Sequence, residues 1–171
     1  MKYLFFTFLG FTMSFAQSGL EKLGSNPVTY IDSVKVSKPE ILRFDSNLIT
    51  LMTVYDPNEA KDIVGEEGKD GAVYIETRGF SKKRFQRYFK SKSREFSKLL
   101  DSKGDDNTFQ YILNGKILTN NFEGELAMID DKVFKKIDII KQKELSAQYK
   151  IKDKDYGIII TSGIPEDSPK K

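Results

Sequence analysis

Residues 63–78, Ile-Val-Gly-Glu-Glu-Gly-Lys-Asp-Gly-Ala-Val-Tyr-Ile-Glu-Thr-Arg, form the stretch that decides the fold of this chain. Glycines interrupt its first half at Gly65, Gly68 and Gly71, and glycine adopts a positive φ angle without a steric penalty. Apart from Glu76, residues 72–77 are then small, β-branched or aromatic, which is typical of a strand. The stretch therefore predicts a glycine-rich turn that leads directly into a β-strand.

A weaker copy of this pattern lies near the end of the chain, where Gly157 precedes three isoleucines and a threonine at residues 158–161. Strand-like segments also end at Asp32-Ser33 in the first half and at Asn114-Gly115, a strong hairpin-turn dipeptide, in the second. We interpret the chain as two divergent copies of one β-β-α-β-α-β unit with a mixed sheet, an α+β fold. Chance similarity of short strand-turn pieces is the alternative.

The spacing of these landmarks predicts how the two copies align. The turns are 82 residues apart (33 to 115) and the glycines 86 (71 to 157), so the second copy is expected to hold about four extra residues. Gly71 and Gly157 are predicted to occupy equivalent positions, each immediately before a closing strand. Gly68, Gly71, Asn114-Gly115 and Gly157 are thus the predicted structural turns.

The first residues have the pattern of a secretory signal peptide. Lys2 supplies the positive start, and residues 3–13 form a mostly apolar run that is too short to span a bilayer. Residues 14–16, Ser-Phe-Ala, make a small-x-small cleavage site. We expect export with cleavage after Ala16, and no lipid anchor because Gln17 is not a cysteine. A buried N-terminal strand or helix is the alternative.

The composition of the whole chain is that of a globular protein rather than a disordered one, with 39% hydrophobic and 31% charged residues. Changes in composition along the chain divide it into segments. The predicted segments are a signal peptide at 1–16, a leader at 17–26, unit 1 at 27–80, a linking helix at 81–104, unit 2 at 105–163 and a disordered tail at 164–171.

The linking helix is predicted to be amphipathic and basic. Six large apolar side chains share one face at helical spacing: Phe85, Tyr88, Phe89, Phe96, Leu99 and Leu100. We expect this face to pack on one or both units, with a break near residues 91–93. The opposite face carries the candidate binding residues Lys83, Arg87, Lys90 and Arg94. They suit acidic headgroups, an anionic glycan or an acidic protein, and a merely solvated basic face is the alternative.

The composition excludes the commonest forms of catalysis. The sequence has no His and no Cys, so a Ser-His-Asp triad, a thiol nucleophile and a His- or Cys-ligated zinc site cannot be built from it. Glu66, Glu67 and Asp70 crowd one turn but lack the spacing of a calcium loop. We expect no catalytic residues, no metal and no cofactor. The net charge of +3 is too small to favour nucleic acid as a partner.

Both units resemble the plug domain of TonB-dependent receptors, best known in outer-membrane nutrient receptors of Bacteroidetes-type bacteria. Residues 27–33, Pro-Val-Thr-Tyr-Ile-Asp-Ser, are similar to the family segment PLYVIDG, and residues 71–78 to its closing strand GVILITTK. Residues 53–56 stand at the family's VLKD segment. The second copy matches at residues 111–116, at Tyr149 and at residues 157–161.

The resemblance implies a function as well as a fold. The family's plug sits inside a large barrel, and a chain of 171 residues is expected to be a plug-type module without one. It implies a non-enzymatic, periplasmic or outer-membrane-associated envelope protein that acts through contacts with another envelope protein, as an accessory to TonB-dependent uptake. No transmembrane segment is expected in the mature chain. The alternatives are a protein that binds a membrane surface or anionic glycan, and a hydrolase that uses only carboxylates.

Overall fold

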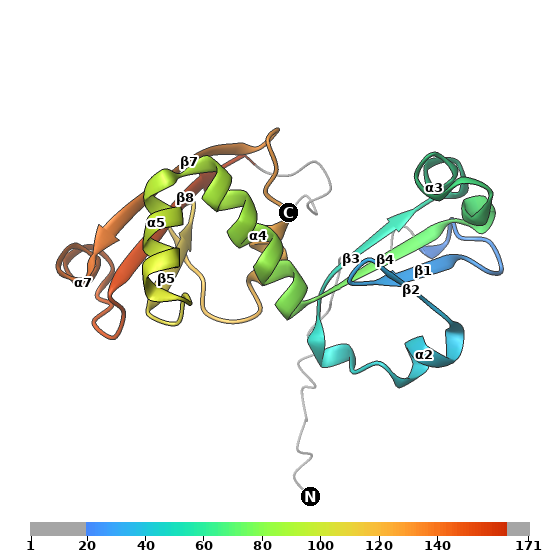
Figure 1. Ribbon diagram of the computed structural model, residues 1–171, viewed down its shortest axis with the longest axis horizontal. Helices are drawn as coiled ribbons and strands as arrows, with labels where there is room; N and C mark the ends of the chain where they lie inside the picture. Colours follow the sequence, from blue (N-terminus) through green and yellow to red (C-terminus); the bar gives the residue numbers. More distant parts are fainter. Residues whose placement is uncertain (1–19, 164–171) are drawn as a thin grey trace, which may run out of the picture.

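The computed structural model describes residues 20–163, which form two α+β units joined in sequence by a pair of helices (Figure 1). Each unit contains a four-stranded mixed sheet, so the predicted fold class is confirmed. The predicted signal peptide and the predicted tail, 1–16 and 164–171, lie outside the described residues.

Unit 1 follows the predicted order of elements. They are β1 (Val28–Ile31), β2 (Val34–Val36), α2 (Lys38–Arg43), β3 (Ile49–Tyr55), α3 (Pro57–Val64) and β4 (Ala72–Thr77), with short 3-10 turns at Ser46–Leu48 and Gly65–Asp70. The strand order is β2-β1-β4-β3. β1 and β4 are parallel, while the other neighbouring pairs are antiparallel.

Unit 2 repeats this topology. Its elements are β5 (Phe109–Leu113), β6 (Lys116–Ile117), α6 (Glu123–Ala127), β7 (Phe134–Lys141), α7 (Gln142–Tyr149) and β8 (Tyr156–Ser162). The order β6-β5-β8-β7 has the same directions as the sheet of unit 1, with β5 and β8 parallel.

The two hairpin turns are built in the same way, as predicted. Asp32-Ser33 and Asn114-Gly115 have positive φ at both central residues, with φ values of 51° and 68° in the first turn and 50° and 83° in the second, as a type I′ turn requires. In each unit the closing strand then bonds back to the first turn residue. The Thr77 amide donates to Asp32 Oδ1 at 2.7 Å and the Ser162 amide to Asn114 Oδ1 at 3.0 Å.

The strand registers give the alignment of the copies and correct one prediction. Ile31 pairs with Ile75, and Leu113 pairs with Ile160, so the offset is 82 residues at the turn (31 to 113) and 85 at the closing strand (75 to 160). The second copy therefore has three extra residues by this measure (85 − 82), not four. Gly157 pairs with β5 and β7 as Ala72 pairs with β1 and β3.

The predicted equivalence of Gly71 and Gly157 is thus wrong by one residue, and Gly157 lies within β8 rather than in a turn. Packing explains why a glycine is there. A Cβ on Gly157 would lie 2.9 Å from Ile140 Cγ1 of β7 and 2.9 Å from Leu145 Cδ1 of α7. In unit 1 the same helix–strand contact joins Ala60 and Ala72, both fully buried. One unit fills this space with two alanines and the other with a leucine and a glycine.

The glycine turn before β4 uses its glycines in two ways. Gly71 has φ of +89°, and a Cβ there would lie 2.4 Å from Leu23 Cδ2, so its role as a turn residue is confirmed. Gly68 lies in a 3-10 turn without a positive φ. A Cβ on Gly68 would lie 2.6 Å from the Ala60 carbonyl, so this glycine allows close packing on α3 rather than an unusual backbone conformation.

The predicted linking helix is two helices, α4 (Arg78–Lys92) and α5 (Arg94–Lys103). It starts three residues earlier than predicted (81 − 78), because Thr77 ends β4 and caps α4 without a linker. The break falls at Ser93, inside the predicted interval. Its extended backbone ends α4, and its hydroxyl accepts a hydrogen bond from the Phe96 amide at 3.1 Å.

The apolar face of the helix pair packs on unit 2. Phe85, Phe89, Phe96 and Leu100 are buried in one cluster with the side chains of β5 and β8, which confirms that this face is covered. Figure 1 shows α4 and α5 beside that sheet. The helix pair is therefore part of the core of unit 2, and unit 1 keeps two smaller apolar clusters of its own.

We expect Gly71→Val to lower the free energy of unfolding by more than about 1 kcal/mol, because a β-branched residue is strained at positive φ and its Cβ would clash with Leu23. The control is Gly79→Ala in α4, where a Cβ meets nothing within 4 Å. This change should stabilise by about 0.5–1 kcal/mol through helix propensity. Urea unfolding of both variants gives the comparison, and equal effects would contradict it.

We expect Gly157→Ala to destabilise by about 1–3 kcal/mol through overpacking against Leu145 and Ile140. In a Leu145→Ala background the same change should cost less, because only the Ile140 side chain still lies close to the new methyl group. A double-mutant cycle in urea unfolding measures this coupling. Additive effects would show that the two side chains do not share one space.

Candidate functional site

The four predicted cations do not form one continuous strip. Lys83 and Arg87 are exposed on α4 and make no ion pair within residues 20–163. Lys90 instead has its Nζ 2.6 Å from Asp101 Oδ1 on α5, which ties the two helices together. Arg94 lies on α5, beyond the break. On α4, only Lys83 and Arg87 of the four predicted residues are both exposed and outside an ion pair among the described residues.

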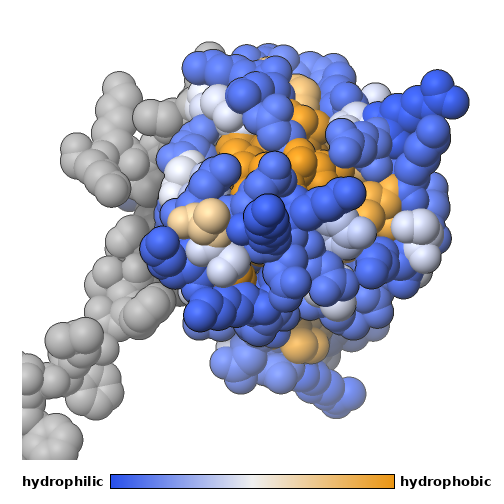
Figure 2. Space-filling model, turned by 90° about the vertical axis from the view of Figure 1, so that its left-hand side faces the viewer, coloured by the Kyte–Doolittle hydropathy of each residue, from blue (hydrophilic) through white to orange (hydrophobic). Residues whose placement is uncertain are grey.

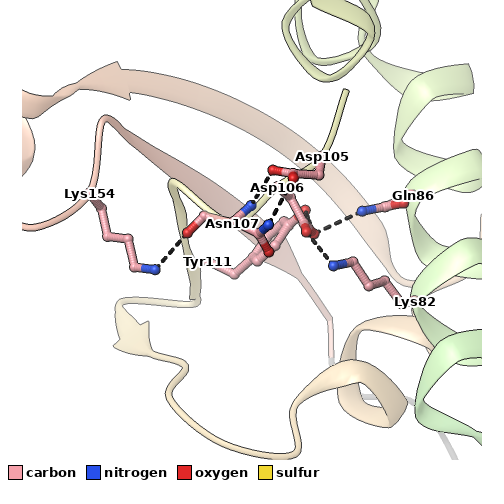
Figure 3. Close-up of polar contacts among 7 residues, drawn as sticks. All are labelled: Lys82, Gln86, Asp105, Asp106, Asn107, Tyr111 and Lys154. Carbon is pink, nitrogen blue, oxygen red and sulfur yellow. Dashed lines mark hydrogen bonds and ion pairs between the residues drawn. The ribbon is translucent and has the colours of Figure 1, made fainter. Parts of the chain in front are cut away.

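A buried carboxylate, which sequence reasoning missed, joins α4 to the sheet of unit 2. The side chain of Asp106 is 6% exposed and forms an ion pair with Lys82. Gln86 Nε2 donates to Asp106 Oδ2 at 2.8 Å, and the Tyr111 hydroxyl donates to the same oxygen at 3.0 Å. Figure 3 shows these donors converging on the carboxylate, two from α4 and one from β5.

The residues beside Asp106 hold its loop in place. The Asp105 carboxylate accepts a hydrogen bond from the Asn107 amide at 3.0 Å, and Lys154 Nζ donates to the Asn107 carbonyl at 2.8 Å (Figure 3). Burial, followed by the charge of Asp106, raises the pKa of Tyr111 well above its usual range. The hydroxyl therefore stays protonated and acts as a donor.

A cavity of about 290 Å³ opens beside this cluster. Its walls are aromatic and charged, and include Phe85, Phe109, Tyr111, Phe122, Lys82 and Lys154. Three donors already occupy the Asp106 carboxylate, and Lys154 is bonded to a backbone carbonyl. This arrangement holds the helix pair on the sheet and presents no free base or nucleophile at Asp106.

A shallower groove of about 620 Å³ lies between α5 and β7. The apolar part of its lining consists of Leu99, Ile139 and Tyr156. Two cations, Lys98 and Lys141, also line the groove. Figure 2 views the molecule from this end, where hydrophilic side chains cover most of the surface and apolar ones show between them.

The acidic turn before β4 makes ordinary surface contacts. Glu67 forms an exposed ion pair with Lys35 at 2.8 Å. Within residues 20–163, no three His, Cys, Asp or Glu side chains lie close enough together to hold a metal ion. Within the same residues, no helix has the length and apolar character needed to cross a bilayer.

Comparisons with protein-family models, with curated proteins and with solved structures gave no match. The resemblance of segments 27–33 and 71–78 to plug domains therefore stays a prediction from the sequence.

We expect Asp106→Ala to lower the free energy of unfolding by about 2–3 kcal/mol, because Lys82, Gln86 and Tyr111 lose a charged acceptor. The exposed neighbour gives a matched control. Asp105→Ala removes only turn contacts to Asn107 and should cost less than about 1 kcal/mol. Urea unfolding distinguishes the two, and similar losses would show that the Asp106 cluster does not hold the helix pair.

Proposed function

We propose that this protein is a non-enzymatic envelope protein that acts through protein–protein contacts, and that unit 1 carries the contact surface. The distribution of exposed apolar side chains supports this. Six large apolar residues are exposed within residues 20–163, and four of them belong to unit 1: Val34, Leu42, Leu48 and Ile63. Of the other two, Leu20 lies in the leader and Ile117 in unit 2.

Two of these side chains are far more open than folding of unit 1 requires. Leu42 is 86% exposed on α2, and Val34 is 65% exposed on β2. α2 has no buried residue, although Ser37 and Glu40 cap its first turn. A helix without a fully buried side chain gains little stability from its own unit. Covering each such side chain by a partner would contribute roughly 1.5–3 kcal/mol before the costs of association.

Unit 2 has the opposite character. Its core is one cluster of thirteen buried residues, enclosed by the helix pair and α6. The two clusters of unit 1 contain three buried residues each. This contrast favours unit 2 as a scaffold and unit 1 as the part that meets another protein.

The cellular setting rests on the sequence alone. The signal-peptide pattern of residues 1–16 favours export, and the resemblance to plug domains favours a role as an accessory to TonB-dependent uptake at the outer membrane. That last step is an analogy of fold rather than an argument from a site.

A second candidate function is peripheral binding to anionic lipid or glycan. Lys83 and Arg87 favour it, because both are exposed and unpaired among the described residues. Two cations give a weak attraction that physiological salt screens beyond about 8 Å.

Site-specific photo-crosslinking in the native cell tests the leading proposal. We expect a crosslinker at position 34 or 42 to capture an envelope protein, and one at the exposed apolar residue Ile117 of unit 2 to capture none. Leu42→Ser should weaken the capture at position 34 without changing the free energy of unfolding. Capture from position 117 alone, or capture unaffected by Leu42→Ser, would contradict the proposal.

Vesicle binding tests the second candidate. If the basic pair binds lipid, vesicles rich in anionic lipid should retain the protein at low salt and release the variant with both Lys83→Glu and Arg87→Glu. A Lys116→Glu, Lys136→Glu variant keeps the same net charge change on unit 2. Equal binding by the two variants would leave the α4 pair without a specific role.

A further inference from the structure

The duplicated fold offers a comparison between two equivalent edge strands. β3 and β7 are the outer strands of their sheets. Both bulge at the same place, with register shifts between Ile49 and Leu51 and between Phe134 and Lys136. An outer strand presents unpaired amides and carbonyls that can bind another strand. Within residues 20–163, no backbone hydrogen bond joins residues 51–54 to any element other than β4.

β7 carries the usual protection against pairing with another strand. Lys135, Lys136, Asp138 and Lys141 are all exposed along it. Lysines on an edge strand oppose the approach of a second strand, because pairing would remove their charges from water or place like charges together.

β3 lacks this protection. Its sequence, Ile-Thr-Leu-Met-Thr-Val-Tyr, has no charged residue, no proline and no glycine, and all seven residues are half-buried. At the 85-residue offset between the two strands, Lys135, Lys136 and Asp138 of β7 correspond to Thr50, Leu51 and Thr53 of β3. Since the backbone pairing of the two strands is the same, the difference lies in their side chains.

We propose that β3 pairs in antiparallel fashion with β3 of a second copy of this chain, which would join two four-stranded sheets into one. One end of β3 is already occupied, because a Cβ on Gly124 of α6 would lie 2.2 Å from the Thr50 carbonyl oxygen. The free segment is therefore residues 51–55, and its centre is Thr53.

The side chains of this segment complement a reversed copy of themselves. With the twofold axis at Thr53, Leu51 faces Tyr55 of the second copy and Met52 faces its Val54, which are apolar pairs on the two faces of the sheet. Thr53 faces its own equivalent, and threonine pairs across antiparallel strands are favourable. A twofold axis places the residue at the centre of the strand opposite the same residue of the second copy, so a charge there would face an identical charge. The uncharged strand β3 therefore suits this contact, and β7, with Asp138 at the equivalent position, does not.

This contact goes beyond the proposed function and uses a different part of unit 1 from Val34 and Leu42, the two most exposed apolar side chains. Val34 lies on β2, at the opposite edge of the same sheet. Dimerisation through β3 therefore leaves the proposed partner surface at β2 open, and either can exist without the other.

Sedimentation of the protein as the cell makes it tests self-pairing. We expect a monomer–dimer equilibrium with a dissociation constant between about 1 and about 500 µM, because an interface limited to one strand belongs to the small, weak class. Thr53→Lys should weaken dimerisation at least tenfold, while Asp138→Lys, at the equivalent position of β7, should leave it unchanged. A monomer at every concentration, or equal loss in both variants, would overturn the proposal.

Two further measurements keep the test independent of folding defects. Mixing Thr53→Lys protein with Thr53→Glu protein should restore a mixed dimer, since opposite charges then meet at the twofold axis; failure of the mixture, with both variants folded by circular dichroism, would overturn the pairing. In the unchanged protein, amide hydrogen exchange in residues 51–55 should slow as concentration rises. Exchange that is independent of concentration, or a photo-crosslink from β3 to another protein while the chain stays monomeric, would also overturn it.

Discussion

The hydrogen bonds between Asp32 and Thr77 join three parts of the structure on which both units depend: the first hairpin turn, the end of β4 and the start of α4. The Thr77 amide and hydroxyl each donate to the Asp32 carboxylate at 2.7 Å, so the first hairpin turn is attached to the end of β4. The same hydroxyl accepts the Phe80 amide at 3.3 Å and caps α4. One threonine thus ends the sheet of unit 1 and starts the helix that forms the core of unit 2. Because no linker separates strand from helix, the direction of α4 follows from the direction of β4.

Further contacts along this junction stabilise the arrangement of the two units. Ser81 is fully buried and donates to Glu76 at 2.9 Å, while Thr50 of β3 donates to Ser81 at 3.0 Å. Arg78 forms an ion pair with Glu123 of α6 at 3.7 Å. Unit 1 therefore meets α4 through polar contacts, whereas unit 2 packs on the apolar face of the same helix. The helix pair adds its large buried apolar side chains to the core of unit 2 alone, so unit 1 has the smaller apolar clusters.

The repeat of the fold could be predicted because it depends on local chemistry. Asp32-Ser33 and Asn114-Gly115 favour a tight turn wherever they occur, and Gly71 suits a positive φ that few other residues accept. The alignment of Gly157 with Gly71 failed because a glycine can serve either backbone conformation or close packing. One of its packing partners, Leu145, lies twelve residues away in sequence (157 − 145) and is recognised only once α7 lies on β8.

The sequence by itself determined the α+β class, the duplicated order of strands and helices, and the apolar face formed by Phe85, Phe89, Phe96 and Leu100. These features follow from short-range periodicity and turn residues. Only the tertiary structure decided that this face packs on unit 2, that Asp106 is buried under α4, and that β3 is an edge strand. The reason is that burial and edge position depend on which segments meet in space, and contacts between distant residues leave no periodic pattern in the chain.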